Sequence, residues 1–182
     1  MIEFPDKKYN IIYADPLWDY GNTKNHKGKF WGIADRHYSV LKIEEIISLP
    51  IKDIADKNCY LFIWVTSPFI EKVFKIIKSW SFKYSTIAFV WIKMKNDMSA
   101  IRKDGLGKYT ISNAEYCLIA RSGKYWRKAR NIHQIIQEPK TTHSKKPDIV
   151  RDKIVELCGD LPRIELFARE RVKGWDVWGD EV

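Results

Sequence analysis

The chain has 182 residues, of which 45% are hydrophobic and 30% are charged. This composition is typical of a globular protein and excludes a mainly disordered chain, and the length predicts one domain over residues 1–182. The net charge of +9 favours a polyanionic partner.

The sequence carries no apolar run near the ~20 residues that a membrane span requires, and the N-terminus lacks a signal-peptide core. We therefore expect a cytoplasmic protein without a membrane partner. The three cysteines, Cys59, Cys117 and Cys158, are odd in number and widely spaced, so they predict neither a disulfide framework nor a zinc site. The four histidines also lack metal-ligand spacing, and we expect no metal.

Apolar strand patterns alternate with helical patterns along the chain. The expected strands are residues 9–14, 59–65, 84–92, 114–120 and 163–167. The expected helices are residues 43–49, a helix that begins at Ser67–Pro68 and reaches Trp80, and a helix from Pro147 to Gly159. Residues 93–112 and 125–146 are polar and show no periodicity, which predicts two long loops. This alternation indicates an α/β fold with a mostly parallel sheet.

Asp15, Pro16 and Trp18 follow the first expected strand, at the end where α/β sheets bind ligands. An adenine amine is a poor nucleophile because its lone pair is delocalised into the ring. A carboxylate and a backbone carbonyl that accept its two N–H bonds would free that lone pair. Proline fixes the backbone that aims the carbonyl, and tryptophan can stack on a flipped base. The segment thus points to methylation of a base amine, with an Asp-Pro turn beside a core tryptophan as the alternative.

Two common cofactor motifs are absent. No Gly-x-Gly-x-x-Gly follows the first expected strand, and the chain has no Walker-type loop. Both dinucleotide-dependent oxidoreductases and P-loop NTPases are therefore disfavoured.

The segment Ala14–Trp18 is similar to the Asp-Pro-Pro-Trp motif of the MT-A70 family of adenine-N6 methyltransferases, with Leu17 in place of the second proline. Further similarities follow in order along the chain. They are Tyr38–Ser39 with Glu44–Ile46, Leu61–Thr66, Trp91–Lys93, Gly105–Gly107 with Ser112–Leu118, His143–Asp148, Glu165–Arg169, Gly174–Trp175 and Trp178–Glu181. Together they cover nearly the whole chain, which is identified as a member of this family.

The resemblance implies a Rossmann-like methyltransferase fold with helices on both faces of the sheet, and S-adenosyl-L-methionine as cofactor. It assigns Asp15, Pro16 and Trp18 to catalysis. The implied cofactor-binding residues are Asp15, Lys146, Phe167, Arg169, Gly179, Asp180 and Glu181. In this assignment Asp15 accepts from the cofactor ammonium, Lys146 binds its carboxylate and Arg169 binds the ribose. The alternatives are a solvated Lys145–Lys146 pair and an ion pair between Arg169 and Glu165.

Both long polar stretches are basic, and we expect them to follow a phosphate backbone around the target base, with solvated loops as the alternative. The second also interleaves its charges with Tyr125 and Trp126, which favours nucleic-acid binding. The candidate substrate-binding residues are Tyr38, Trp64, Trp91, Lys93, Glu115, Trp126, Arg127 and Lys128.

We therefore expect an S-adenosylmethionine-dependent DNA adenine methyltransferase of low sequence specificity. No segment is suited to reading a long duplex site or to opening a duplex, so the enzyme should prefer unpaired target bases. Methylation of RNA is the alternative. A non-catalytic nucleic-acid-binding subunit of a heterodimer is a third hypothesis, which the presence of Asp15 and Trp18 disfavours. The sequence leaves a homodimer or a heterodimer open.

Overall fold

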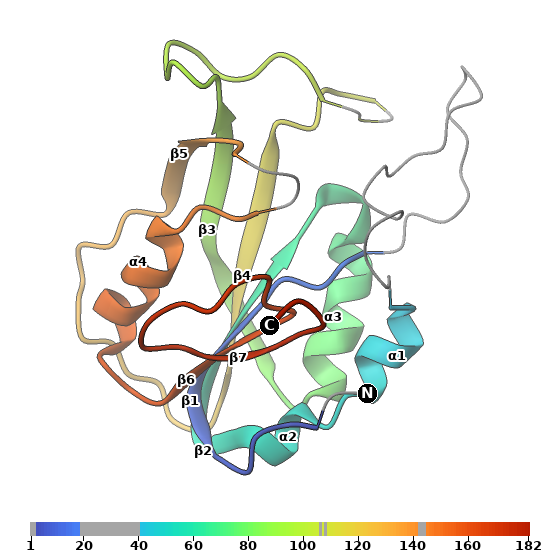
Figure 1. Cartoon of the computed structure of the whole chain (residues 1–182), viewed down its shortest axis with the longest axis vertical. Coiled ribbons are helices and arrows are strands. Elements are labelled where there is room, and N and C mark those ends of the chain that lie inside the picture. The colour runs from blue at the N-terminus through green and yellow to red at the C-terminus, as the bar shows by residue number, and fades with distance from the viewer. Residues whose placement is uncertain (1–2, 19–40, 106, 108, 142–144) are drawn as a thin grey trace.

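A seven-stranded sheet forms the centre of the computed structural model, which describes residues 3–18, 41–105, 107, 109–141 and 145–182 (Figure 1). The strands are β1 (Tyr9–Ala14), β2 (Ala55–Val65), β3 (Lys83–Met94), β4 (Ala114–Ser122), β5 (Ile135–Pro139), β6 (Arg163–Leu166) and β7 (Asp176–Trp178). Their order is β5-β3-β4-β2-β1-β6-β7. Of these strands, β4 alone runs antiparallel to its neighbours, β2 and β3. The expected mostly parallel sheet is confirmed.

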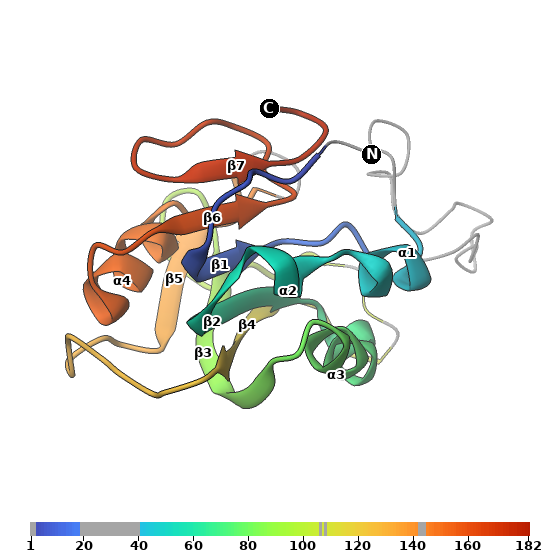
Figure 2. The same ribbon diagram turned by 90° about the horizontal axis from the view of Figure 1, so that it is seen from below.

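Helices cover both faces of the sheet (Figure 2). They are α1 (Ile43–Ser48), α2 (Ile51–Ile54), a 3₁₀ turn (Ser67–Phe69), α3 (Ile70–Ser79) and α4 (Ile149–Cys158). Val73, Ile76 and Ile77 of α3 are buried in one core cluster, which α1 also joins. Val150 and Ile154 of α4 are buried in a second cluster against the opposite face. The central strand β2 is continuously apolar from Cys59 to Val65, because side chains from both of its faces enter these cores there.

The hydrophobic pattern of the sequence did not indicate two of the strands and one short helix. The predicted loop 125–146 contains β5, and the segment after residue 167 contains β7, while α2 follows α1 directly. The two strands are only five and three residues long, so their alternation is too short to stand out. The 3₁₀ turn that leads into α3 has Thr66 at its N-cap position rather than the expected Ser67, and α3 itself has Phe69 there.

The predicted loop 93–112 begins as a hairpin that continues β3. The Lys95 N–H donates to the Ala100 carbonyl at 2.9 Å, and the Arg102 N–H donates to the Lys93 carbonyl at 2.8 Å. Met98, with a φ of 59°, lies in the turn. The Asp97 carboxylate stabilises this turn by accepting from the Ser99 N–H at 3.0 Å.

The parallel strands share one direction, so the carboxyl ends of β1, β2, β3, β5 and β6 lie along one edge of the sheet, here called the site edge. The carboxyl end of β4 lies at the opposite edge, because Ser122 pairs with Cys59 and Tyr116 pairs with Val65. Within the described residues, no helix has both the length and the apolar character needed to cross a membrane.

Candidate active site

Asp15 leaves the sheet at the site edge, directly after β1. Its N–H is 3.5 Å from the Leu166 carbonyl of β6, so its backbone still follows the sheet before Pro16 ends the strand. Lys146, in the segment that leads into α4, approaches both oxygens of the Asp15 carboxylate, at 2.8 and 2.9 Å. The resemblance assigned these two residues to one site, and the structure brings them into contact.

Two further charged side chains complete a buried network. Glu115 stands at the start of β4, and its Oε2 is 3.2 Å from Lys146 Nζ. Its other oxygen is 2.6 Å from Nζ of Lys93, near the end of β3. All four side chains, Asp15, Lys146, Glu115 and Lys93, are at most 17% exposed. The result is a chain of alternating charges across β1, β4 and β3, which we call the site network.

The site network controls the protonation of its members. Burial alone would raise the pKa of Glu115, but Lys146 and Lys93 outweigh it and lower that pKa to about 2. Burial likewise acts to lower the pKa of Lys146, and Asp15 and Glu115 raise it instead. For Asp15 burial prevails over the attraction of Lys146 and raises the pKa. Lys146 is thus held as a cation, and Asp15 is the more easily protonated of the two carboxylates.

Trp64 and Trp91 are buried and lie against the two lysines of the site network, Lys146 and Lys93. They are 1% and 2% exposed, and their rings meet edge to face with centroids 6.4 Å apart. Lys146 Nζ lies 5.7 Å from the Trp64 ring, and Lys93 Nζ lies 5.3 Å from the Trp91 ring. The indole N–H of Trp64 donates to the Tyr13 hydroxyl at 2.6 Å. The two tryptophan rings therefore support the ammonium groups of Lys146 and Lys93.

Trp18 is packed in the core that α1 and α3 cover. It is 7% exposed and stacks on Phe69 at a centroid distance of 5.0 Å. Its indole Nε1 is buried, and no residue in the described part of the chain accepts its proton. This packing corresponds to the core alternative and leaves little ring surface for a base. A stacking role for Trp18 stays a prediction that requires the ring to move.

The predicted cofactor residues after β6 gather beside β1. Phe167, with a φ of 60°, meets Trp178 edge to face. Arg169 does not pair with Glu165: its Nε is 3.9 Å from a Glu181 oxygen, while Glu165 receives two hydrogen bonds from Arg151. The Ala168 N–H donates to the Trp178 carbonyl at 3.0 Å, which brings the C-terminal segment back over residues 167–169.

Gly179 is required by this close approach. A Cβ atom at this position would lie 2.6 Å from the Ala168 carbonyl oxygen. Asp180, which follows it, is exposed, and the side chain of Glu181 is 34% exposed. The predicted cofactor residues of the C-terminal segment therefore stand together at the site edge, on the β6 side of Asp15.

The segment after β4 lies at the opposite edge of the sheet. Trp126 donates its indole N–H to the Cys158 carbonyl at 3.0 Å, and its ring packs on Tyr60 at 4.2 Å. The Lys128 N–H donates to the Leu157 carbonyl at 2.8 Å. Since α4 starts beside Lys146 and ends at Cys158, these contacts are one helix length, about 15 Å, from the site edge.

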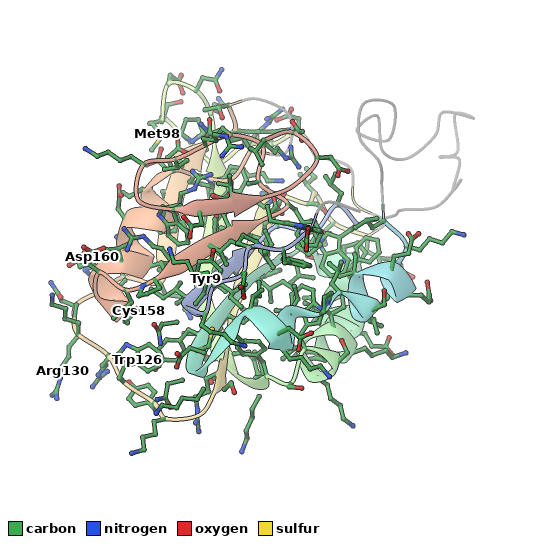
Figure 3. All side chains as sticks on the ribbon, turned by 60° about the horizontal axis from the view of Figure 1, so that its bottom comes forward. Tyr9, Met98, Trp126, Arg130, Cys158 and Asp160 are labelled. Carbon is green, nitrogen blue, oxygen red and sulfur yellow. The ribbon has the colours of Figure 1, made fainter. Side chains whose placement is uncertain are left out.

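Figure 3 shows this separation, with Trp126 and Arg130 at one end of the molecule and Met98 at the other. The structure therefore does not bring Trp126, Arg127 and Lys128 together with the site network. The physical reason is the reversed direction of β4, which the sequence pattern did not reveal. Tyr38 lies outside the described residues, as do His143, Ser144 and Leu106 from the matched motifs.

A second ion-pair cluster, in which only the Arg151–Glu165 pair is buried, supports the segment of Lys146 through that pair and was not predicted. Arg151 of α4 makes two hydrogen bonds to Glu165 of β6, at 2.7 and 2.9 Å, and one to Asp148 at 2.6 Å. Lys145 joins Asp148 and Glu170, each at 3.0 Å. The cluster fixes the start of α4 to β6, and thereby the segment that carries Lys146. The sequence signals for this segment were the Pro147 helix start and the matched motif His143–Asp148, and neither indicated the Arg151–Glu165 pair.

The chain was compared with known proteins. The MT-A70 family model matches residues 9–181. The chain is 37% identical to the type II methyltransferase M.MunI from a Mycoplasma species, over 99% of this chain and 80% of that protein. It is 27% identical to the human N(6)-adenine-specific methyltransferase METTL4 and 26% identical to the N6-methyladenosine RNA methyltransferase MTA1 of Pyricularia oryzae, over 97% and 96% of this chain.

These matches span only 38% of METTL4 and 47% of MTA1. The match to the family model, in contrast, includes the strand before Asp15, the whole site network and the C-terminal segment. The resemblance read from the motifs is confirmed, and the chain belongs to the MT-A70 methyltransferase family.

Proposed function

We propose that this protein transfers a methyl group from S-adenosyl-L-methionine to the exocyclic N6 amine of adenine in DNA. The observation that carries the proposal is the buried site network, in which Asp15 and Lys146 are held together at the site edge. The names of the relatives support the chemistry, since METTL4 is N(6)-adenine-specific and M.MunI is a type II methyltransferase.

The residues at the site fit this cofactor. Its amino-acid end carries an ammonium and a carboxylate, and Asp15 and Lys146 offer the matching opposite charges side by side. Arg169, Gly179, Asp180 and Glu181 would hold its ribose and adenine on the β6 side of Asp15. When bound, the cofactor supplies an electrophilic methyl group.

Asp15 and Pro16 act on the substrate amine. The Asp15 carboxylate and the Pro16 carbonyl accept its two N–H bonds, which favours a pyramidal nitrogen with an available lone pair. Asp15 must be ionised for this, and Lys146 opposes the rise in its pKa that burial causes. Glu115, ionised down to a pH of about 2, keeps Lys146 and Lys93 in place.

DNA is favoured by the relation to the type II methyltransferase M.MunI, and RNA is the second candidate because MTA1 is an RNA methyltransferase. We further propose low sequence specificity and a preference for unpaired target bases, since extracting a stacked base costs about a few kcal/mol. A non-catalytic role is disfavoured because Asp15 is present and is held by Lys146.

The proposal is tested with cofactor labelled in its methyl group. Single-stranded DNA, duplex DNA and RNA of the same sequence, each with one adenine, are incubated with the protein, and the nucleosides are separated after digestion. We expect label in N6-methyldeoxyadenosine, fastest from single-stranded DNA. Label in RNA alone would replace DNA by RNA, and label in none of the three would contradict the proposed activity.

A further inference from the structure

We propose that Lys140 binds the phosphate of the nucleotide whose adenine is methylated, as part of a cationic rim formed with Lys93 and Arg102. This inference rests on the proposed function, because it names a substrate contact of the same site. Lys140 belongs to none of the matched motifs and was not among the expected site residues.

The sheet register places Lys140 next to the site network. Residues Lys93 and Met94 of β3 pair with Glu138 and Pro139 of β5, so Lys140 follows at the level of Lys95. Paired residues share a face of a sheet, and side chains alternate along a strand. Lys140 therefore lies on the face of Lys93, the same face that carries Trp91 and the α4 core cluster.

Arg102 borders the same rim from the other side of β3. The bridge between Met94 and Ile101, with the hydrogen bond from the Arg102 N–H to the Lys93 carbonyl, sets Arg102 opposite Lys93. Burial lowers the pKa of Lys140, the like charges of Lys93, Arg102 and Lys146 lower it further, and the attraction of Glu115 opposes them without reversing the shift. These cations thus surround Lys140 closely enough to destabilise its own charge.

Lys140 differs from the other three cations in its ion pairs. Lys93 pairs with Glu115, Lys146 pairs with Asp15 and Glu115, and Arg102 pairs with Asp104. None of the ion pairs or hydrogen bonds found among residues 3–18, 41–105, 107, 109–141 and 145–182 uses the Lys140 ammonium. A half-buried cation without a paired carboxylate, beside three other cations, is suited to bind an anion.

The strand order indicates which anion this is. The proposed cofactor residues follow β6 and β7, on one side of β1, whereas Lys93 lies at the end of β3 and Lys140 follows β5, on the other side. Lys146 stands between them at Asp15 and already matches the cofactor carboxylate. A base whose amine meets Asp15 must extend its sugar and phosphate away from the cofactor, toward β3 and β5. The anion that reaches Lys140 is then the phosphate next to the target base.

The test uses a fluorescent single-stranded DNA with one adenine, and its dissociation constant is measured by anisotropy over a range of salt concentrations. Lys140→Gln should weaken binding about tenfold and reduce the slope of log K against log salt by about 0.7, the value for one phosphate contact in a single strand. Lys140→Arg should restore both. Lys128→Gln, which removes a lysine at the opposite edge, is the matched control and should change neither.

A neutral methylphosphonate at either phosphate beside the adenine identifies the contact. One of the two substitutions should weaken binding to the native protein and have no further effect on Lys140→Gln. Wild-type affinity and salt slope in Lys140→Gln, or an undiminished methylphosphonate effect in that variant, would overturn the inference. If the native protein transfers no methyl group but Lys140→Gln still loses this contact, the proposed reaction fails and the phosphate site stands.

Discussion

Residues 93–112 and 125–134, the latter being the part of the basic stretch 125–146 that precedes β5, are both rich in lysine and arginine and lie at opposite edges of one sheet. The first follows β3 and sends Lys93 into the site network. The second follows β4, the antiparallel strand, and its Trp126 packs on Tyr60 and binds the end of α4. The direction of a single strand thus decides whether a run of lysines and arginines can reach the reacting base.

The difference between the edges also appears in how charges are paired. At the site edge, four largely buried ionic side chains depend on one another, and removing one leaves an uncompensated charge. At the opposite edge, Asp160 pairs with Arg163 at 2.5 Å but is 84% exposed, so water replaces any lost partner. Substitutions of similar chemistry should therefore have large effects at the first edge and small effects at the second.

The largest expected effect is that of Asp15→Asn. Asparagine has nearly the same shape but places a donor where the cofactor ammonium and the substrate amine both require an acceptor. We expect methyl transfer to fall by at least about 100-fold, in the range of a lost transition-state contact. Asp160→Asn is the matched carboxylate substitution at the opposite edge and should leave the rate unchanged. Retained turnover in folded Asp15→Asn would show that this carboxylate does not hold the amine.

Lys146→Met should have the next largest effect, on cofactor binding. Loss of a charge-assisted contact worth about 1.5–3 kcal/mol raises the dissociation constant of S-adenosylmethionine roughly 10- to 100-fold. The adjacent Lys145 pairs with the exposed Asp148 and Glu170, and Lys145→Met is the control. Calorimetry should find near-native affinity for Lys145→Met. Equal affinities in both variants would remove Lys146 from the cofactor site.

At the opposite edge, Trp126→Ala should affect stability rather than chemistry. The Trp126 ring packs on Tyr60, and its indole N–H donates to the Cys158 carbonyl. Its removal should lower the free energy of unfolding by about 3 kcal/mol. The neighbouring Tyr125 is 62% exposed, and Tyr125→Ala should leave stability unchanged. Denaturant unfolding measures both values. A stable Trp126→Ala variant with weakened nucleic-acid binding would return this ring to the substrate.

How far the sequence could predict these features depends on the length of each signal. The apolar run Cys59–Val65 of β2 and the amphipathic helix α3 were predicted because these signals extend over seven and ten residues. Asp15 and Lys146 were assigned through the family motifs, while their contact required the fold. Lys140 carries no sequence signal, since a lysine after a five-residue strand resembles any other. The pairing of β5 with β3 gives it a position beside the site network.

The smallest effect is expected for the double variant Arg127→Gln/Lys128→Gln. Both side chains are exposed at the opposite edge, beyond the end of α4, and a short single-stranded oligonucleotide centred on the target adenine does not span that distance. Methylation of such an oligonucleotide should therefore match the native rate within about twofold. Longer DNA could pass around the edge of the sheet, and any loss of affinity should then grow with its length and shrink with added salt. Lys140→Gln provides the contrast, because its effect should be complete on the short oligonucleotide. If both variants weakened the short substrate equally, the two basic segments would act on the same stretch of backbone, and their separation across the sheet would not determine substrate binding.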